Sequence, residues 1–306
     1  MRLLFHWPAW GACLAVLVAV TAAACSSEPA SEGAPDGGPN PDGDAARGDG
    51  PALPGDDASA PADGEAPSKV DVTNETVDVD GRPRDYVLAV PKTYAASRSY
   101  PLVIAFHGDG FNGPSFRNYF RIDNETGDDA IVTWPTGNDW DLFTDYDVNN
   151  DQKLVEAVIL AIKSKYNVDD AKIWGVGYSK GGFLASEIAC HKPGLLKAMA
   201  IHAGGAPQEP NGANGYPLCP SAIGLPVLVS HGTLDPQFGG GDYAANYWAL
   251  VAGCGDTRSA TTPSPCQKHD GCPASSPVLF CPVDGLRHVP LWSEAAKVSW
   301  AFFTSL

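Results

Sequence analysis

AKIWGVGYSKGG, residues 171–182, joins a short apolar run to a Gly-x-Ser-x-Gly pattern centred on Ser179. A helix-compatible segment, 182–189, follows at once, so the pattern predicts a strand, a tight turn and a helix in succession. Such a turn holds the serine in strained backbone angles, and Gly177 and Gly181 remove the side chains that would collide there. We therefore expect the Ser179 hydroxyl to be exposed at the carboxyl end of a sheet, over a helix amino terminus that favours negative charge.

Strand and helix patterns alternate through the rest of the chain after residue 69. The continuous apolar run at 101–108 predicts a strand buried on both faces, 226–232 predicts a further buried strand, and 151–166 has the apolar spacing of a helix. Strands that alternate with helices predict an α/β fold with a mostly parallel sheet covered on both faces. Other expected elements are an amino-terminal antiparallel pair (70–80 and 84–90), strands at 130–134, at 198–202 and from 278, and helices at 243–251 and 293–303.

The first 25 residues indicate export. Arg2, a wholly apolar run at 14–20 and small residues before Cys25 are typical of a secretory signal. The small residues before Cys25 are similar to a bacterial lipobox, which predicts that Cys25 is lipidated and becomes the mature amino terminus. The alternative is ordinary cleavage near Ala24 and free release. The expected location is therefore the bacterial cell envelope, through one lipid anchor, or the extracellular space.

Residues 26–68 are rich in Pro, Gly, Ala, Asp and Ser, a composition that predicts a disordered tether. Of the formal net charge of −16, this tether carries −9 and Arg2 carries +1, which leaves −8 for residues 69–306. A mildly acidic domain argues against nucleic acid as a partner. The remaining segment, about 240 residues, suits one α/β domain with a sizeable core, which we expect to be a monomer.

Six cysteines lie beyond the signal, and an even number in an exported domain predicts three disulfides. Sequence alone leaves the connectivity open. A competing interpretation is a Cys₃His zinc site built from part of this set and His269, but exported thiols oxidise, so we expect no metal. The disulfide candidates are Cys190, Cys219, Cys254, Cys266, Cys272 and Cys281; the zinc set would be Cys266, His269, Cys272 and Cys281.

A nucleophilic serine needs a base, and the base needs an acid to orient it. In the chain order Ser, Asp, His, the acid is expected after a later strand, where the sequence has HGTLDP at 231–236. We predict Asp235 as the acid, with Asp242 and Asp284 as alternatives. The competing interpretation of Asp235 is purely structural, because Asp before Pro is common in turns.

The base must lie later still, and only His269 and His288 follow Asp235. We predict His288, because it comes just past the last expected strand, whereas His269 precedes that strand. His202 and His231 end buried strands, and we expect them to be structural.

Ester chemistry also needs donors for the developing oxyanion, each worth about 3 kcal/mol. One expected donor is the backbone N–H of Lys180, next to the nucleophile. The second is expected from the glycine-rich loop 107–113, where we predict the Asp109 N–H, with Gly110 as the alternative.

These pieces together resemble the secreted feruloyl esterases and poly(3-hydroxybutyrate) depolymerase-like proteins, within the α/β-hydrolases. The resemblance spans most of residues 85–303 and implies the same triad of Ser179, Asp235 and His288. Two positions depart from the family: Arg287, where it often has Gly, and Lys180, where it often has Met, Gln or Ala. The matching stretches are 100–113, 177–182, 231–235 and 271–290.

The resemblance implies a serine esterase that needs no cofactor and whose partner is an ester substrate on polysaccharide or polyester. A hydroxycinnamoyl ester on plant polysaccharide is the expected substrate, with hydroxyalkanoate polyester or acetylated xylan as alternatives. Trp140 and Trp292, with Trp134 and Phe143 as further aromatics, are expected to line the acyl pocket, where planar rings would stack; packing of these aromatics is the alternative. A different class is a non-catalytic, glycan-binding surface protein, against which the complete Ser, Asp and His set argues.

Overall fold

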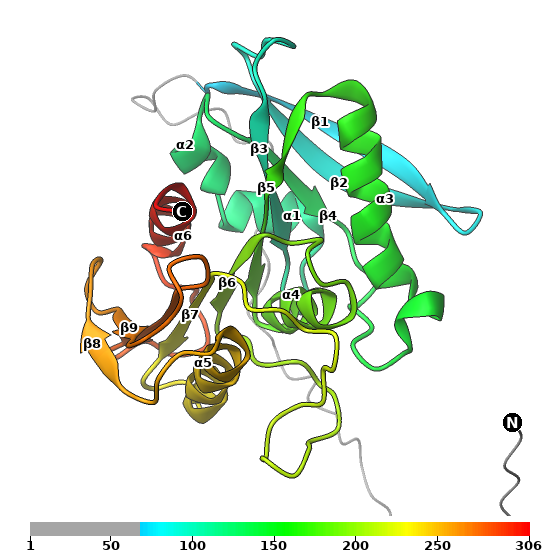
Figure 1. The fold of residues 1–306 in the computed structure, drawn as a ribbon. Helices are drawn as coiled ribbons and strands as arrows, with labels where there is room; N and C mark the ends of the chain where they lie inside the picture. Colours follow the sequence, from blue (N-terminus) through cyan, green and yellow to red (C-terminus); the bar gives the residue numbers. More distant parts are fainter. Residues whose placement is uncertain (1–67) are drawn as a thin grey trace, which may run out of the picture. The chain divides into compact units, whose positions relative to one another are not determined.

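The computed structural model describes residues 68–306 (Figure 1). The chain divides into two units, 1–62 and 63–306, and only the second contains described residues. The expected signal at 1–25, the lipidated Cys25 and the tether up to residue 67 therefore lie outside the described residues. Among the helices within 68–306, none combines the length and the apolar character needed to cross a membrane.

Ten strands form one sheet in the order β1-β2-β4-β3-β5-β6-β7-β10-β9-β8. The six central strands (β4, β3, β5, β6, β7 and β10) are parallel, and the two strands at each edge are antiparallel. Because parallel strands end at the same side of the sheet, the loops after β3, β5, β7 and β10 meet there. The strand bounds are β1 Val70–Val79, β2 Arg82–Pro91, β3 Tyr100–Phe106, β4 Ile131–Pro135, β5 Val168–Tyr178, β6 Ala198–His202, β7 Val227–Gly232, β8 Arg258–Ala260, β9 Gln267–His269 and β10 Val278–Val283.

Helices cover both faces of this sheet, as predicted (Figure 1). Side chains of α3, α4 and α5 form the core on one face, and side chains of α1, α2 and α6 form the core on the other. Strand β3 serves both: Leu102 and Ile104 point into the first core, and Val103 and Ala105 into the second, which explains its unbroken apolar run. The helix bounds are α1 Gly113–Tyr119, α2 Ile122–Thr126, α3 Asn150–Lys165, α4 Lys180–His191, α5 Phe238–Ala252 and α6 Ala295–Thr304, with a 3₁₀ turn η1 at Tyr146–Val148.

The α/β-hydrolase architecture is confirmed, but some elements differ from the sequence prediction. Helix α5 begins at Phe238 rather than at 243, so the three glycines at 239–241, which we interpreted as a loop, form its first turn. Glycine disfavours a helix by about 1 kcal/mol, but the packing of α5 against β7, with Gly241 directly on His231, opposes that preference. The sequence patterns also missed α1, α2, β8 and β9, which are too short to show a clear period.

The six cysteines of the domain form three disulfides, as predicted. The zinc alternative loses its ligands, because its three cysteines are all oxidised, two of them to each other, and His269 contacts Arg258 instead. Such a set of disulfides fits an extracellular protein. The pairs are Cys190–Cys219, Cys254–Cys272 and Cys266–Cys281.

Candidate active site

Ser179 stands at the turn between β5 and α4 with φ 53° and ψ −121°. This left-handed conformation is rare for a residue with a side chain and confirms the predicted backbone strain. The two flanking glycines are required by close contacts: a Cβ at Gly177 would overlap the Gly181 carbonyl, and one at Gly181 would overlap the Phe106 carbonyl. The chain can therefore turn sharply enough to present the hydroxyl at the end of the parallel sheet.

Ser179, His288 and Asp235 lie in one hydrogen-bonded line. Ser179 Oγ is 2.9 Å from His288 Nε2, and His288 Nδ1 is 2.7 Å from Asp235 Oδ2. The three residues come from the turn after β5, the loop after β10 and the loop after β7. The tertiary structure thus brings together three residues that are 56 and 53 positions apart in sequence.

The alternative acids and base lie outside this line. Asp242 pairs with Arg258 at 2.6 Å, and Asp284 accepts a hydrogen bond from Thr233 Oγ1 at 3.1 Å. His269 Nε2 accepts a hydrogen bond from the Arg258 guanidinium at 2.8 Å. Each of these side chains therefore has a partner that gives it a structural role.

Hydrogen bonds join the loop that carries Asp235 to the loop that carries His288. The Leu234 N–H donates to the Leu286 carbonyl at 2.9 Å, and the Gly285 N–H donates to Thr233 Oγ1 at 2.9 Å. Because these contacts flank both residues, they set the carboxylate and the imidazole at hydrogen-bonding distance.

The Asp235 carboxylate is buried and fully engaged. Its Oδ1 accepts the Gln237 N–H at 2.8 Å, while its Oδ2 faces His288 and also His231, whose Nε2 is 2.8 Å away. Burial alone would raise the pKa of the Asp235 carboxyl, but the Gln237 amide, the His288 hydrogen bond and the neighbouring histidines outweigh it and lower that pKa. Asp235 is therefore ionised at neutral pH. The sequence patterns identified His231 only as a structural residue and missed this contact.

The two predicted oxyanion residues, Asp109 and Lys180, are neighbours in the structure. A Cβ at Gly108 would lie 3.1 Å from Ser179 Cβ, so the loop after β3 passes directly over the serine. As the first residue of α4, Lys180 has a backbone N–H without an acceptor inside the helix. Its ammonium extends to Asp139 Oδ1 at 2.8 Å and to Asp109 Oδ1 at 3.5 Å.

Partial burial would lower the pKa of the Lys180 ammonium, but the carboxylates of Asp139 and Asp109 outweigh it and raise that pKa. The cation beside the serine is therefore neutralised by two acids that belong to two different loops. This arrangement gives the Lys180 side chain a place in the site: it ties the oxyanion loop to the loop that follows β4.

Buried polar groups support the same loops. His107 Nε2 accepts the Gly137 N–H at 3.0 Å, and its Nδ1 lies 2.9 Å from the Gly108 carbonyl. Burial lowers the pKa of the His107 imidazole, so the neutral ring accepts at Nε2 and donates at Nδ1.

The expectation that Trp140 lines the acyl pocket is wrong. Its side chain is 1% exposed, and its indole N–H donates to the His107 carbonyl at 2.7 Å. Trp134 is also fully buried. Trp134 lies on β4 and packs into the core on one face of the sheet, whereas Trp140, in the loop after β4, packs into the core on the other face.

The other two expected aromatics are accessible. Phe143 is 79% exposed, and Trp292 is half-buried. Trp292 lines a hollow of only ≈ 10 Å³ beside His288 and a wider one of ≈ 420 Å³ along α6. Its expected contact with substrate stays a prediction.

A row of aromatic rings that sequence did not indicate leads from the oxyanion loop to His288. Ring centroids are 5.0 Å apart for Phe111 and Tyr119, and 6.1 Å for Tyr119 and Tyr178. Tyr178 then stacks on the His288 imidazole at 5.7 Å and donates its hydroxyl to the His288 carbonyl at 2.7 Å. Tyr119 is 39% exposed, so part of this row faces solvent.

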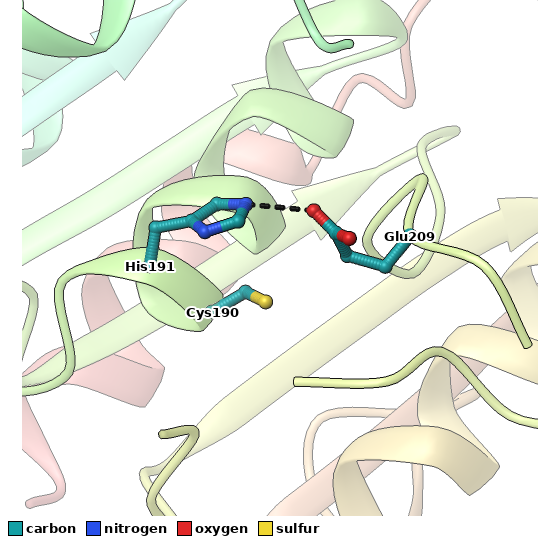
Figure 2. Close-up of side chains that lie close together, drawn as sticks. All are labelled: Cys190, His191 and Glu209. Carbon is teal, nitrogen blue, oxygen red and sulfur yellow. Dashed lines mark ion pairs between the residues drawn. The ribbon is translucent and has the colours of Figure 1, made fainter. Parts of the chain in front are cut away.

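Apart from the group of His231, Asp235 and His288, a cluster of side chains of the kinds that bind metals lies at the carboxyl end of α4 (Figure 2). It contains Cys190, His191 and Glu209, but the Cys190 sulfur is bonded to Cys219. Figure 2 shows the His191 ring directed at the Glu209 carboxylate, with Nε2 and Oε1 2.8 Å apart. With its thiol oxidised, this cluster is an ion pair beside a disulfide and fits no metal.

No protein-family model matches the chain. Among curated relatives, a protein named "Probable feruloyl esterase C" from Aspergillus terreus is 27% identical over 255 residues, which cover 76% of this chain and 87% of that protein. Feruloyl esterase C from Emericella nidulans is 27% identical over 251 residues and covers the same shares of the two chains, 76% and 87%.

Solved structures share the fold at low sequence identity. The acetyl xylan esterase from Aspergillus awamori aligns with a TM-score of 0.61 and 17% identity, covering 76% of this chain and 99% of that one. The feruloyl esterase module from Clostridium thermocellum complexed with sinapinate aligns with a TM-score of 0.56 and 13% identity, covering 78% and 87%.

The fold and these relatives define the chain as a carboxylic ester hydrolase with the α/β-hydrolase architecture. Within that class its similarity to the feruloyl esterases agrees with the resemblance drawn from its motifs.

Proposed function

We propose that this protein is an exported serine esterase that hydrolyses its substrate through an acyl-enzyme. The observation that carries the proposal is the line from Ser179 Oγ through His288 to Asp235 Oδ2, with separations of 2.9 and 2.7 Å. The strained turn at Ser179 supports it, because such angles are retained where a reactive group must be held in place.

In this mechanism Ser179 Oγ attacks the ester carbonyl while His288 Nε2 takes the hydroxyl proton. The resulting oxyanion is stabilised by the backbone N–H groups of Lys180 and Asp109. His288 then gives the proton to the departing alkoxide, and the acyl group stays on Ser179. A water molecule, deprotonated by His288, attacks the acyl-enzyme and releases the carboxylic acid, while ionised Asp235 stabilises the imidazolium in both steps.

We propose a hydroxycinnamoyl ester on plant cell-wall polysaccharide as the substrate. The names of the relatives support this choice, as do the accessible rings of Phe111 and Tyr119, on which a planar phenolic ring could stack. Acetylated xylan is the second candidate, because a solved structure with the same fold is named an acetyl xylan esterase. A hydroxyalkanoate polyester is the third, from motif resemblance alone.

The test of catalysis uses Ser179→Ala, which removes the nucleophile but leaves the backbone donors of α4 in place. Turnover of p-nitrophenyl acetate should fall by about 10⁴-fold or more. Unchanged turnover in the purified variant would reject the serine mechanism. A panel of methyl ferulate, acetylated xylan and hydroxybutyrate oligomers, compared by kcat/KM, then ranks the three substrate classes.

For localisation we propose attachment to the bacterial cell envelope through a lipid on Cys25, and for quaternary structure a monomer. A mass spectrum of the mature amino terminus should show a lipidated Cys25; an unmodified peptide that starts after Ala24 would indicate free release instead.

A further inference from the structure

His231 is a buried histidine that the serine mechanism above does not use. It lies near the end of β7, four residues before Asp235, and its side chain is 1% exposed. Its Nε2 is 2.8 Å from Asp235 Oδ2, the same oxygen that lies 2.7 Å from His288 Nδ1. One carboxylate oxygen is therefore shared by two imidazoles, one facing the serine and one facing the protein interior.

The short distance determines which nitrogen of His231 carries the proton. Two acceptors could not lie 2.8 Å apart in a buried site without a hydrogen between them, so Nε2 carries it and the carboxylate receives its dipole. Neither ring nitrogen makes an aligned hydrogen bond, so the contact with Asp235 is a short electrostatic one. Burial lowers the pKa of the His231 imidazole, so the ring is neutral and contributes a dipole rather than a charge.

Helix α5 holds the His231 ring against Asp235. The helix approaches so closely that a Cβ at Gly241 would overlap the ring at Nδ1 and Cβ, and Phe238 meets the ring edge-on with centroids 6.3 Å apart. This contact explains the glycine at position 241, because a side chain there would push His231 out of place.

Few other titratable groups of the described residues face this pair. Tyr178 on β5 and His288 face Asp235, and β6 contributes His202, whose nitrogens contact Ser230 and Ser299. Burial lowers the pKa of His202 to about 3, so it stays neutral. The neighbours on α5, Phe238 and Gly241, do not titrate. Besides His288, His231 is therefore the described imidazole in direct contact with the Asp235 carboxylate.

We propose that His231 is a positioning residue that acts on His288 through Asp235. It fixes the carboxylate and draws negative charge away from the oxygen that faces His288. The imidazolium of His288 is then stabilised less strongly, so His288 becomes an active base at lower pH and transfers its proton to the leaving group more readily. This inference rests on the proposed serine mechanism.

The test compares His231→Gln, whose amide N–H can reach the position of Nε2, with His231→Met, which has similar length and no donor. The pH profile of kcat/KM for p-nitrophenyl acetate is measured on the full-length enzyme. In His231→Met the acid limb should move to higher pH by about half a unit and the plateau of kcat should fall by about tenfold, with KM little changed. In His231→Gln the limb should stay at the wild-type position.

Gly241→Ala provides a second variant that changes no polar group. Its methyl group should displace the His231 ring and move the acid limb in the same direction as His231→Met, which decides the question if His231→Met does not fold. An unmoved limb in His231→Met or Gly241→Ala, or an equal shift in His231→Gln, would overturn the proposal. Ser179→Ala separates the two hypotheses. If this variant keeps full turnover, the serine mechanism fails. If it is inactive while the acid limb of His231→Met and Gly241→Ala stays at the wild-type position, only the role of His231 fails.

Discussion

Asp235 shows how much a single side chain depends on its surroundings. Its sequence neighbour Pro236 also suits an ordinary turn. The carboxylate is nevertheless contacted by the Gln237 N–H, His288 Nδ1 and His231 Nε2, at distances between 2.7 and 2.8 Å. An ionised carboxylate with this many donors is held in one orientation. The imidazole that it contacts can then present a single nitrogen to Ser179.

Asp235→Asn should therefore reduce kcat/KM for p-nitrophenyl acetate by about 10³–10⁴-fold, because the amide can stabilise the wrong imidazole tautomer and no imidazolium. Asp284→Asn is the matched control: it lies on the neighbouring loop and can still accept from Thr233 Oγ1, so its activity should stay near wild type. Equal losses in the two variants would show that loop structure, rather than the carboxylate, is being measured.

At the scale of elements, helix α4 organises the site from both of its ends. Its first residue, Lys180, reaches two loops through Asp139 and Asp109. Its later residues hold the loop after β6, since Ser186 Oγ donates to the Gly205 carbonyl at 2.8 Å and Glu187 accepts the Gln208 N–H. The helix thus connects three of the loops around Ser179.

Lys180→Met should loosen the oxyanion loop while keeping the backbone N–H of residue 180. We expect kcat to fall by about tenfold with a smaller change in KM, since the loss is in transition-state stabilisation. Lys153→Met, which removes a surface pair with Asp80, is the control and should be neutral. A variant at Lys180 with unchanged kcat would show that the ion pairs do not position the loop.

Glu187 makes the stability of α4 depend on pH. Burial, opposed by the Gln208 hydrogen bond and reinforced by the nearby Glu209 charge, raises the pKa of the Glu187 carboxyl from 4.5 to about 7. A raised folded-state pKa means that the native state holds the proton more tightly, so this stabilisation is complete below pH 4.5 and is lost as pH rises through 7.

Glu187→Gln should remove that loss. The variant should be more stable than wild type at pH 8 by about 2 kcal/mol and close to it at pH 5, measured by thermal unfolding at both values. Glu294→Gln, at an exposed position on the surface, should show no such pH-dependent difference. If Glu187→Gln follows the wild-type pH dependence, the Glu187 carboxyl does not control it.

In the molecule as a whole, the disulfides secure the end of the sheet that carries His288. Two of the three bridges, Cys254–Cys272 and Cys266–Cys281, hold the strands and loops around β8, β9 and β10. The two edge strands β8 and β9 have only three residues each, so they have little hydrogen bonding of their own to stabilise them.

Removal of the Cys266–Cys281 bridge by a double substitution to Ala should lower stability by about 3 kcal/mol, since the crosslink closes a loop with a sequence separation of 15. Thermal unfolding should show a Tm about 10 °C lower. A matched double substitution at Cys254 and Cys272, with a separation of 18, should cost a similar amount. An unchanged Tm in both would show that the edge strands are stable without the bridges.

Much of the architecture was predictable because it depends on local patterns. The buried strands β3, β6 and β7 are continuous apolar runs, and the turn at Ser179 needs glycines two residues to either side. Short elements such as α1 and β9 were missed, since a few residues show no period. Trp140 was misjudged because a large aromatic suits a pocket wall and a core equally well.

By itself, the sequence determined the order of the expected catalytic residues along the chain: a serine on a strained turn, then an acid and a histidine on later loops. Tertiary structure alone decided which groups touch, because contacts between residues far apart depend on how parallel strands align at one side of the sheet. It rejected His269 and Asp242, placed Lys180 between two acids, and set His231 and His288 on the same oxygen of Asp235. The close approach of α5 that fixes His231 could not be read from residue spacing, because it arises only when the helix packs on the sheet.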